Sequence, residues 1–274
     1  METIAEYIER IEIDQLWSGQ RHVDWRLRRH VNVLSGVNGV GKSTILSRVV
    51  RHLMAVSREE RADDGVTLTY NVPEARTVRF DVVRSFDRPV VNSELLGKIT
   101  DIHLSSELDL QLYQLQRAYL DYQVNLSNRM LRLFTEGDAE AKDKAAKIAE
   151  EKTHFFDVVD SLFSDTGKLI LRERNEIQFS QHGETIAPYL LSSGEKQILI
   201  ILLTVLTEAR QPCVLLMDEP EISLHVEWQE RLIGLIRDLN PEAQIILTTH
   251  SPAVIIDGWG DCVTDVEDII SDPN

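Results

Sequence analysis

The chain has 274 residues, of which 43% are apolar and 27% are charged. This length and composition suit one large α/β domain, or a core domain that carries an inserted subdomain, and they exclude a disordered chain. The formal net charge of −16 also excludes a globally basic nucleic-acid binder, because contacts to phosphate need concentrated lysine and arginine.

The cysteine pattern and the N-terminus argue against an exported or membrane-bound protein. Cys213 and Cys262 lie far apart, without histidine or cysteine at metal-ligand spacing, which predicts neither a disulfide framework nor a zinc site. The first residues lack a basic segment followed by an apolar run, so no signal peptide is expected. The longest apolar stretch, residues 198–206, has about half the length that a membrane span needs. We therefore expect a cytoplasmic protein without a membrane partner.

Three β-like runs, at Ile8–Leu16, 23–27 and 31–34, open the chain. Trp17 and Trp25 are interpreted as core or sheet packing, with adenine stacking as the alternative. A group of basic residues in this region fits either a local nucleic-acid contact or, as we favour, the solvent side of the strands. These residues are Arg21, His22, Arg26, Arg28, Arg29 and His30.

A glycine-rich loop follows the third run. Its sequence, GVNGVGKST at residues 36–44, fits the phosphate-loop pattern between an expected strand and a helix expected over residues 42–56. Backbone N–H groups and the positive helix N-terminus suit phosphate oxygens. We expect Lys42 to reach the β and γ phosphates and Ser43 to ligate Mg²⁺. The predicted nucleotide-contacting residues of this loop are Gly36, Asn38, Gly39, Gly41, Lys42, Ser43 and Thr44.

The middle of the chain changes from β to helical periodicity. Two β-like stretches, at 66–71 and 77–84, flank a Pro-Glu turn and are interpreted as an antiparallel addition to the core. Residues 94–162 are helical in pattern, and a second helix over 139–162 is expected to fold back on the first. This hairpin is either a plain core pair or an arm that binds a partner. The apolar stripe of the first helix comprises Leu108, Leu112, Leu115, Tyr119, Tyr122, Leu126, Met130 and Leu133.

The last third alternates helix and strand, with strands at 214–217 and Gln244–Thr248 and helices ending at 209 and 239. This alternation predicts the sheet-and-helix layering of a nucleotide-binding α/β domain. Asp218 at the end of the first strand is expected to hold the water shell of Mg²⁺. Glu219 is the candidate general base for the attacking water.

A second anion site is predicted at residues 191–197, LSSGEKQ. Serine and glycine beside a helix start offer a hydroxyl and free backbone N–H groups. One triphosphate has little need of two such sites in one chain. The residues predicted to contact nucleotide here are Ser192, Ser193, Gly194 and Glu195.

These motifs in this order resemble those of ABC-type ATPases in the SMC, RecF and OLD-like branch, which includes small ATP-binding proteins of bacterial DNA-repair or anti-phage systems. The resemblance covers residues 8–40, 41–56 and 188–256. Residues 220–225, PEISLH, look like the D-loop of this branch, and His250 matches the switch histidine that contacts the γ phosphate. No Q-loop glutamine can be assigned, because Gln111, Gln114 and Gln116 lie in the helical stripe, while residues 84–88 fall where such a loop would begin.

The resemblance implies an α/β P-loop NTPase fold of ABC type, with a mixed sheet core, an antiparallel β addition and an inserted helical hairpin. Residues 1–90 and 166–274 are assigned to the ATPase core, and 91–165 to the helical subdomain. It further implies a homodimer in which the serine-glycine turn of one copy closes on ATP and Mg²⁺ held by the other. Because no nuclease motif is visible, a nuclease or toxin effector is expected on another polypeptide. The alternatives are a nucleotide-binding subunit of a membrane transporter and an ATP-switched scaffold with little turnover.

Overall fold

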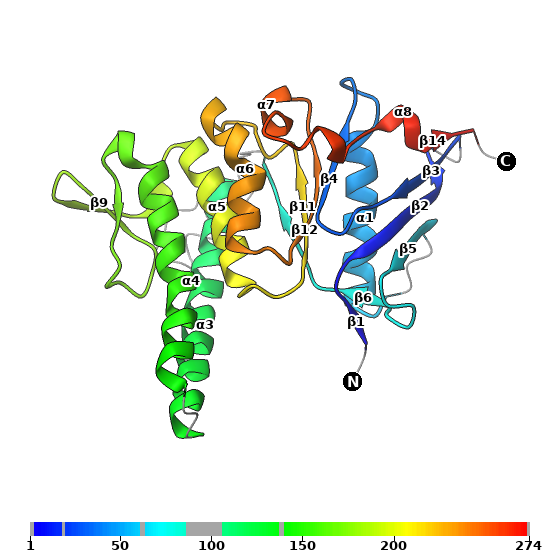
Figure 1. Cartoon of the computed structure of the whole chain (residues 1–274). Helices are drawn as coiled ribbons and strands as arrows, with labels where there is room; N and C mark the ends of the chain where they lie inside the picture. Colours follow the sequence, from blue (N-terminus) through cyan, green and yellow to red (C-terminus); the bar gives the residue numbers. More distant parts are fainter. Residues whose placement is uncertain (1–2, 18–19, 61–63, 86–105, 137–139, 273–274) are drawn as a thin grey trace.

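The computed structural model describes residues 3–17, 20–60, 64–85, 106–136 and 140–272. Its centre is a five-stranded parallel sheet in the order β13-β4-β12-β11-β7 (Figure 1). Apolar side chains alternate between the two faces, so that Leu215 and Met217 enter one core while Val214 and Leu216 enter the other. A sheet covered on both faces needs such continuously apolar strands. Its strands are β4 (Val31–Ser35), β7 (Phe80–Val83), β11 (Val214–Asp218), β12 (Gln244–Thr248) and β13 (Val263–Asp265).

Helix α1 (Lys42–Ser57) covers one face of this sheet and is covered in turn by a second, antiparallel sheet (Figure 1). The predicted helical face is confirmed, because Ile45, Val49 and Leu53 are all buried. The layer beyond α1 has the order β14-β3-β2-β5. Its strands are β2 (Ile8–Leu16), β3 (Arg21–Arg26), β5 (Val66–Tyr70) and β14 (Ile270–Ser271).

The opposite face of the parallel sheet packs against helices (Figure 1). Helix α5 is the most apolar of them and is buried over most of its length, whereas α6 buries one face. No helix in the described ranges is long and apolar enough to cross a membrane. The helices of this layer are α3 (Glu107–Thr135), α4 (Ala141–Leu162), α5 (Ser193–Thr207) and α6 (Val226–Leu239).

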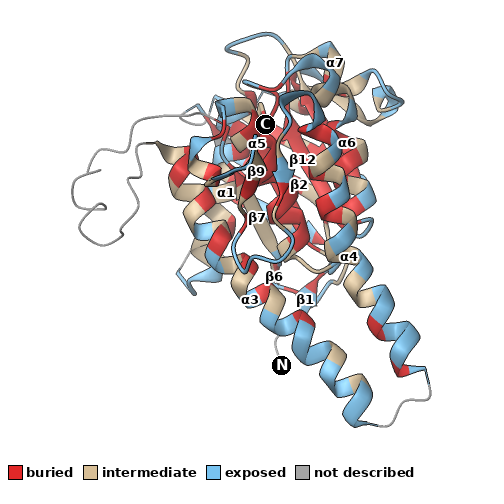
Figure 2. Cartoon of the chain, turned by 90° about the vertical axis from the view of Figure 1, so that its left-hand side faces the viewer, coloured by how far each residue is buried: buried red, intermediate tan, exposed pale blue. Residues whose placement is uncertain are grey.

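Helices α3 and α4 form the predicted hairpin, which packs on the core at its root and projects at its far half, while binding of a partner by this arm stays a prediction. Its root packs on α5, with Leu108, Leu112 and Tyr119 buried. Its far half projects from the body as an arm whose surface is mostly exposed (Figure 2). Residue 139, where the second helix is predicted to start, lies outside the described residues, and α4 begins at Ala141.

The interpretation of residues 77–84 as part of an antiparallel addition was wrong. The short strand β6 (Thr77–Val78) pairs in parallel with β1 (Ile4–Ala5), and β7 pairs in parallel with β11 as an edge of the central sheet. Only β5 joins the antiparallel sheet. The reason is that β periodicity identifies a strand but not the strand with which it pairs. The turn between the two stretches suggested that they pair as a hairpin.

Several short elements escaped sequence analysis because two to four residues are too few for a periodic signal. A three-stranded antiparallel sheet follows α4, with the order β10-β9-β8. Two single-turn helices lie near the C-terminus. These elements are β8 (Leu169–Ile170), β9 (Phe179–Gln181), β10 (Glu184–Ile186), α7 (Pro252–Ile255) and α8 (Val266–Ile269).

A carboxyl pair on β7 and after α5 predicts a pH-dependent stability. Burial, together with a hydrogen bond to Glu208, raises the pKa of Asp81 to about 8. The folded protein thus holds this proton more tightly than the unfolded chain, and the associated stability is lost as pH rises from about 4 through about 8. We expect Asp81→Asn to raise Tm at pH 8 by about 2–4 °C, the shift that 1 kcal/mol produces in a domain of ~200 residues. The gain should shrink as pH falls and vanish below about pH 4, and a lower Tm of the variant at pH 8 would contradict the assignment.

Candidate active site

The phosphate loop connects β4 to α1, as the sequence predicts. Gly36, Gly39 and Gly41 have φ values of +146°, +84° and +109°, a backbone region that side chains with a Cβ rarely adopt. The Lys42 side chain lies back along the loop, and its Nζ donates to the carbonyl oxygen of Gly36 at 2.8 Å. With only 4% of Lys42 exposed, the ammonium group is fixed at the loop rather than extended into solvent.

Three oxygen-bearing side chains meet at the carboxyl ends of the strands. Ser43 Oγ donates to Asp218 Oδ1 at 2.9 Å, and Thr248 Oγ1 donates to the same oxygen. Mg²⁺ prefers such oxygen ligands and commonly takes one or two from the protein, with phosphate and water completing its shell. No group of three or more His, Cys, Asp or Glu side chains in the described ranges is arranged to hold a metal by itself. The serine-aspartate pair therefore fits a Mg²⁺ ion shared with a triphosphate.

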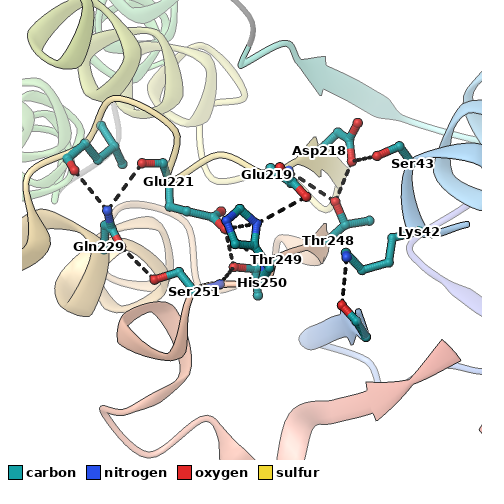
Figure 3. A network of polar contacts seen from close by, with 12 residues as sticks. Lys42, Ser43, Asp218, Glu219, Glu221, Gln229, Thr248, Thr249, His250 and Ser251 are labelled. Atoms are coloured by element: carbon teal, nitrogen blue, oxygen red, sulfur yellow. Dashed lines mark hydrogen bonds and ion pairs between the residues drawn. The ribbon is translucent and has the colours of Figure 1, made fainter. Parts of the chain in front are cut away.

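Glu219 and His250 lie side by side beyond this pair (Figure 3). His250 Nδ1 is 3.2 Å from Glu219 Oε1. Glu219 has a left-handed backbone with φ +46°, and its N–H donates to the carbonyl oxygen of Thr248 at 3.0 Å. Bonding to the neighbouring strand offsets the cost of this unfavourable backbone. The side chains proposed as base and switch histidine thus meet at the ends of β11 and β12.

Glu221 is a site residue that sequence analysis missed. Its side chain is 4% exposed, and Oε1 accepts hydrogen bonds from Thr249 Oγ1 and from the His250 backbone N–H at 3.3 Å. His250 Nδ1 lies 3.8 Å from the same oxygen. The available signal was a second acid two residues after Glu219, which we interpreted only as part of the D-loop.

The serine-glycine turn caps the start of α5. Ser192 and Glu195 form a capping box, in which each side chain accepts a hydrogen bond from the backbone N–H of the other residue. Glu195 Oε1 also accepts from Thr166 Oγ1 and from Lys168 Nζ. Burial opposes ionisation, but the hydrogen bonds from Lys168, Ser192 and Thr166 outweigh it and lower the pKa of Glu195. Ser192 and Ser193 are exposed, whereas the Glu195 carboxylate is engaged within the protein.

Gly194 allows a close backbone approach within this turn. A Cβ at this position would lie 2.4 Å from the carbonyl oxygen of Ser223, a distance that real Cβ atoms do not tolerate. Ser223 itself has φ +73°. The serine-glycine turn and the D-loop are therefore packed backbone to backbone.

Three consecutive side chains at the start of α5 each contact a different element. Glu195 binds Lys168 after α4 at 2.8 Å. Lys196 binds Asp109 in the first turn of α3 at 2.7 Å. Gln197 donates to Ser85 after β7 at 3.4 Å. The turn is thus connected to both roots of the arm and to the end of the edge strand.

The two predicted phosphate-binding regions line separate cavities of the chain. Gly36, Asn38 and His250 belong to a cavity of about 400 Å³. The Ser192–Glu195 turn, with D-loop residues, belongs to another of about 570 Å³. A third cavity of about 640 Å³ lies beside Ser43 and Asp218. None of these three sets of lining residues contains both phosphate-loop and serine-glycine-turn residues.

The glutamines considered for a Q-loop have other contacts. The side-chain amide of Gln111 binds the backbone of Arg84 twice: Oε1 accepts from the Arg84 N–H at 3.1 Å, and Nε2 donates to the Arg84 carbonyl oxygen at 3.2 Å. Gln116 holds the backbone of Ile177 in the same way, at 2.9 and 2.8 Å. Residues 86–88, where a Q-loop was sought, lie outside the described residues.

The two N-terminal tryptophans differ in environment. Trp25 is 2% exposed and belongs to the core, as expected. For Trp17 the packing interpretation was wrong, because its side chain is 41% exposed and lies against the phosphate loop. A Cβ at Gly41 would be 2.6 Å from its Cζ2. Trp17 thus presents an aromatic ring beside the loop expected to hold the nucleotide.

We predict that Trp17→Ala weakens ATP binding by about 1–3 kcal/mol, the range that stacking of a base on an aromatic side chain contributes. Trp17→Phe should retain most of the affinity. Titration with a fluorescent ATP analogue measures the effect, and thermal unfolding shows whether the fold is kept. Equal affinities of wild type and Trp17→Ala would rule out the stacking role.

Three of the six basic residues near the N-terminus, Arg21, His22 and Arg29, are paired with acids. Arg29 Nη2 is 3.0 Å from Glu242, His22 is 3.2 Å from Asp14, and Arg21 pairs with Asp272. Such pairing on strands and their turns supports the solvent-side interpretation over a nucleic-acid contact.

The fold and this site define a P-loop ATPase of ABC type, with an Asp-Glu strand end, a histidine beside this glutamate and a serine-glycine turn capping a helix. A model of the family described as "AAA domain, putative AbiEii toxin, Type IV TA system" matches residues 57–257. The chain belongs to this family.

Individual relatives agree with this assignment. Septu protein PtuA of Bacillus thuringiensis is 25% identical over 303 residues, covering 90% of this chain and 72% of that protein. The Retron Vc95 probable ATPase of Vibrio cholerae serotype O1 biovar El Tor is 30% identical over 86 residues, which cover 27% of this chain and 17% of that protein. The phosphate import ATP-binding protein PstB of Mycobacterium intracellulare is 39% identical over 67 residues, which cover 24% of this chain and 22% of PstB.

Among solved structures, an SMC head bound to the C-winged helix domain of ScpA matches with a TM-score of 0.51 and 18% identity. The match covers 92% of this chain and 91% of that one. This likeness confirms the predicted fold class.

Proposed function

We propose that this chain is a Mg²⁺-dependent ATPase that closes as a head-to-tail dimer around ATP and gates a separate effector protein in phage defence. The observation that carries the proposal is that none of the three cavities is lined by both phosphate-loop and serine-glycine-turn residues. A triphosphate that contacts both the phosphate loop and a serine-glycine turn would then need two copies of the chain. The similarity to Septu protein PtuA and to the retron ATPase favours phage defence over DNA repair.

In the proposed reaction the phosphate loop binds the triphosphate through its backbone N–H groups, and Lys42 leaves its carbonyl partners for phosphate oxygens. Ser43 and Asp218 would hold Mg²⁺, which supplies positive charge against the β and γ phosphates when bound. Glu219 accepts the proton of the attacking water, and His250 contacts the γ phosphate. The exposed Ser192 and Ser193 of the second copy close the other side.

A mixing experiment tests the composite site. Lys42→Ala disables the phosphate loop but keeps the serine-glycine turn, whereas Ser193→Arg blocks the exposed turn but keeps the loop. A heterodimer of the two contains one intact composite site. We expect each variant alone to be inactive and an equal mixture to recover about a quarter of wild-type turnover, as random pairing allows. A mixture as inactive as its components would contradict a site shared between copies.

The alternatives receive less support. The similarity to PstB, an importer subunit, spans 67 residues, whereas the similarity to PtuA spans 90% of this chain. A scaffold with little turnover would not require a carboxylate at the Glu219 position beside His250. Measured turnover in the presence of ATP and Mg²⁺ separates the ATPase from such a scaffold.

A further inference from the structure

Glu221 is a buried acid in an unusual electrostatic setting. Its side chain is 4% exposed, and the described residues place no lysine or arginine within ion-pair distance of it. Oε1 accepts from Thr249 Oγ1 and from the His250 N–H, while Oε2 is buried without a hydrogen-bond partner. A buried carboxylate without a cationic partner costs several kcal/mol. In the described part of the chain, the imidazole of His250 is the titratable ring that faces Glu221.

His250 lies between two carboxylates (Figure 3). Its Nδ1 is 3.2 Å from Glu219 Oε1 and 3.8 Å from Glu221 Oε1. The ring nitrogen contacts Glu219 through Oε1, so a turn of the Glu219 side chain toward the attacking water would break this contact. A small rotation of the ring would move the contact of Nδ1 from Glu219 Oε1 to Glu221 Oε1. The opposite ring nitrogen, Nε2, then points away from Glu221 with a fixed orientation.

The loop that carries His250 is held at its other end as well. Gln229 of α6 accepts a hydrogen bond from Ser251 Oγ at 2.8 Å and donates to the carbonyl oxygen of Leu224 at 2.9 Å. Glu221, through the His250 N–H, and Gln229, through the Ser251 side chain, therefore hold the loop on both sides of this imidazole (Figure 3). With the loop held in this way, the remaining freedom is that of the imidazole side chain, which Glu221 faces.

We propose that Glu221 is the positioning residue for His250, the carboxylate that takes over the imidazole N–H when Glu219 turns to the attacking water. The inference rests on the proposed ATPase function and adds a third residue to the Glu219–His250 pair. The same logic applies wherever a carboxylate orients a histidine that acts on substrate: it fixes the tautomer and the direction of the ring.

A double-mutant cycle in the full chain tests this role. Glu221→Gln keeps the shape and can still accept from Thr249 and from the His250 N–H, but it removes the charge. We expect kcat to fall by about 10-fold to 100-fold, as for other residues that orient a functional histidine, with the dissociation constant for ATP unchanged. In a His250→Ala background the same change should cost nothing further, because Glu221 acts through the imidazole.

Controls separate this role from folding and from the proposed function. Asp81→Asn removes another half-buried carboxyl and should keep wild-type kcat. If Glu221→Gln unfolds, Glu221→Asp, which retains the charge, takes its place in the same cycle. Losses that multiply in the double variant, or wild-type kcat in Glu221→Gln, would overturn the positioning role while the ATPase function stands. Wild-type kcat in His250→Ala would instead remove His250 from the proposed mechanism, and Glu221 with it.

Discussion

Replacing Glu219 by glutamine is expected to give a protein that binds ATP and keeps it. The amide preserves the shape of the side chain but cannot accept a proton from the attacking water, so turnover should fall by about 100-fold to 10,000-fold. Since ATP joins the two copies in the proposed mechanism, the uncleaved nucleotide should hold the dimer closed. Sizing chromatography with saturating ATP and Mg²⁺, alongside a phosphate-release assay, measures both effects.

A matched control for this trap is the double variant Lys42→Ala/Glu219→Gln. It lacks the ammonium group at the phosphate loop and should stay monomeric under the same conditions. If Glu219→Gln alone also remains monomeric with saturating ATP, the closed-dimer mechanism fails, whatever its turnover.

The second large effect is expected at Lys42. Its Nζ is 2.8 Å from the Gly36 carbonyl and 3.4 Å from that of Val37, which fixes the ammonium group at the loop. Alanine removes the group that phosphate oxygens would bind. We expect Lys42→Ala to reduce ATP affinity by at least about 100-fold, the factor that ~3 kcal/mol for a hydrogen bond to a charged group produces.

Titration with a fluorescent ATP analogue tests this loss, and thermal unfolding shows whether the loop change affects the fold. Lys42→Arg keeps the charge and serves as the conservative comparison. Undiminished turnover in Lys42→Ala would refute the assignment of the phosphate loop.

Much of the fold could be predicted because its long elements carry strong periodic signals. The strand Gln244–Thr248 and the helix α1 were recognised within one residue, and α4 ends at the predicted residue 162, since apolar side chains recur at the spacing of one buried face. The helical pattern predicted from residue 94 gave no start for α3, which begins at Glu107. The phosphate loop and the Asp218-Glu219 strand end could be located because their chemistry depends on contiguous residues. The boundaries of the helical subdomain stay a prediction.

Other features depend on contacts between distant residues, which no local pattern reveals. Trp17 looked like a core aromatic, and only the course of the chain after β2 brings it to Gly41. Glu221 is separated from His250 by 28 intervening residues, and its burial becomes evident only when β11 and β12 are paired. Likewise, Glu195 resembled a nucleotide contact in sequence, whereas its carboxylate is occupied by Lys168 and Thr166.

The three consecutive contacts at the start of α5 give the arm the geometry of a lever. Helix α3 has 29 residues, so its tip lies about 40 Å from its root at 1.5 Å per residue. Because the first half of α3 packs on α5, about 20 Å of the helix projects, and a tilt of about 5° where it leaves the body would carry the tip through roughly 2 Å. Lys196 binds the first turn of α3, and Glu195 binds Lys168 in the segment after α4. A slight adjustment of the serine-glycine turn would therefore be transmitted to the far end of the arm.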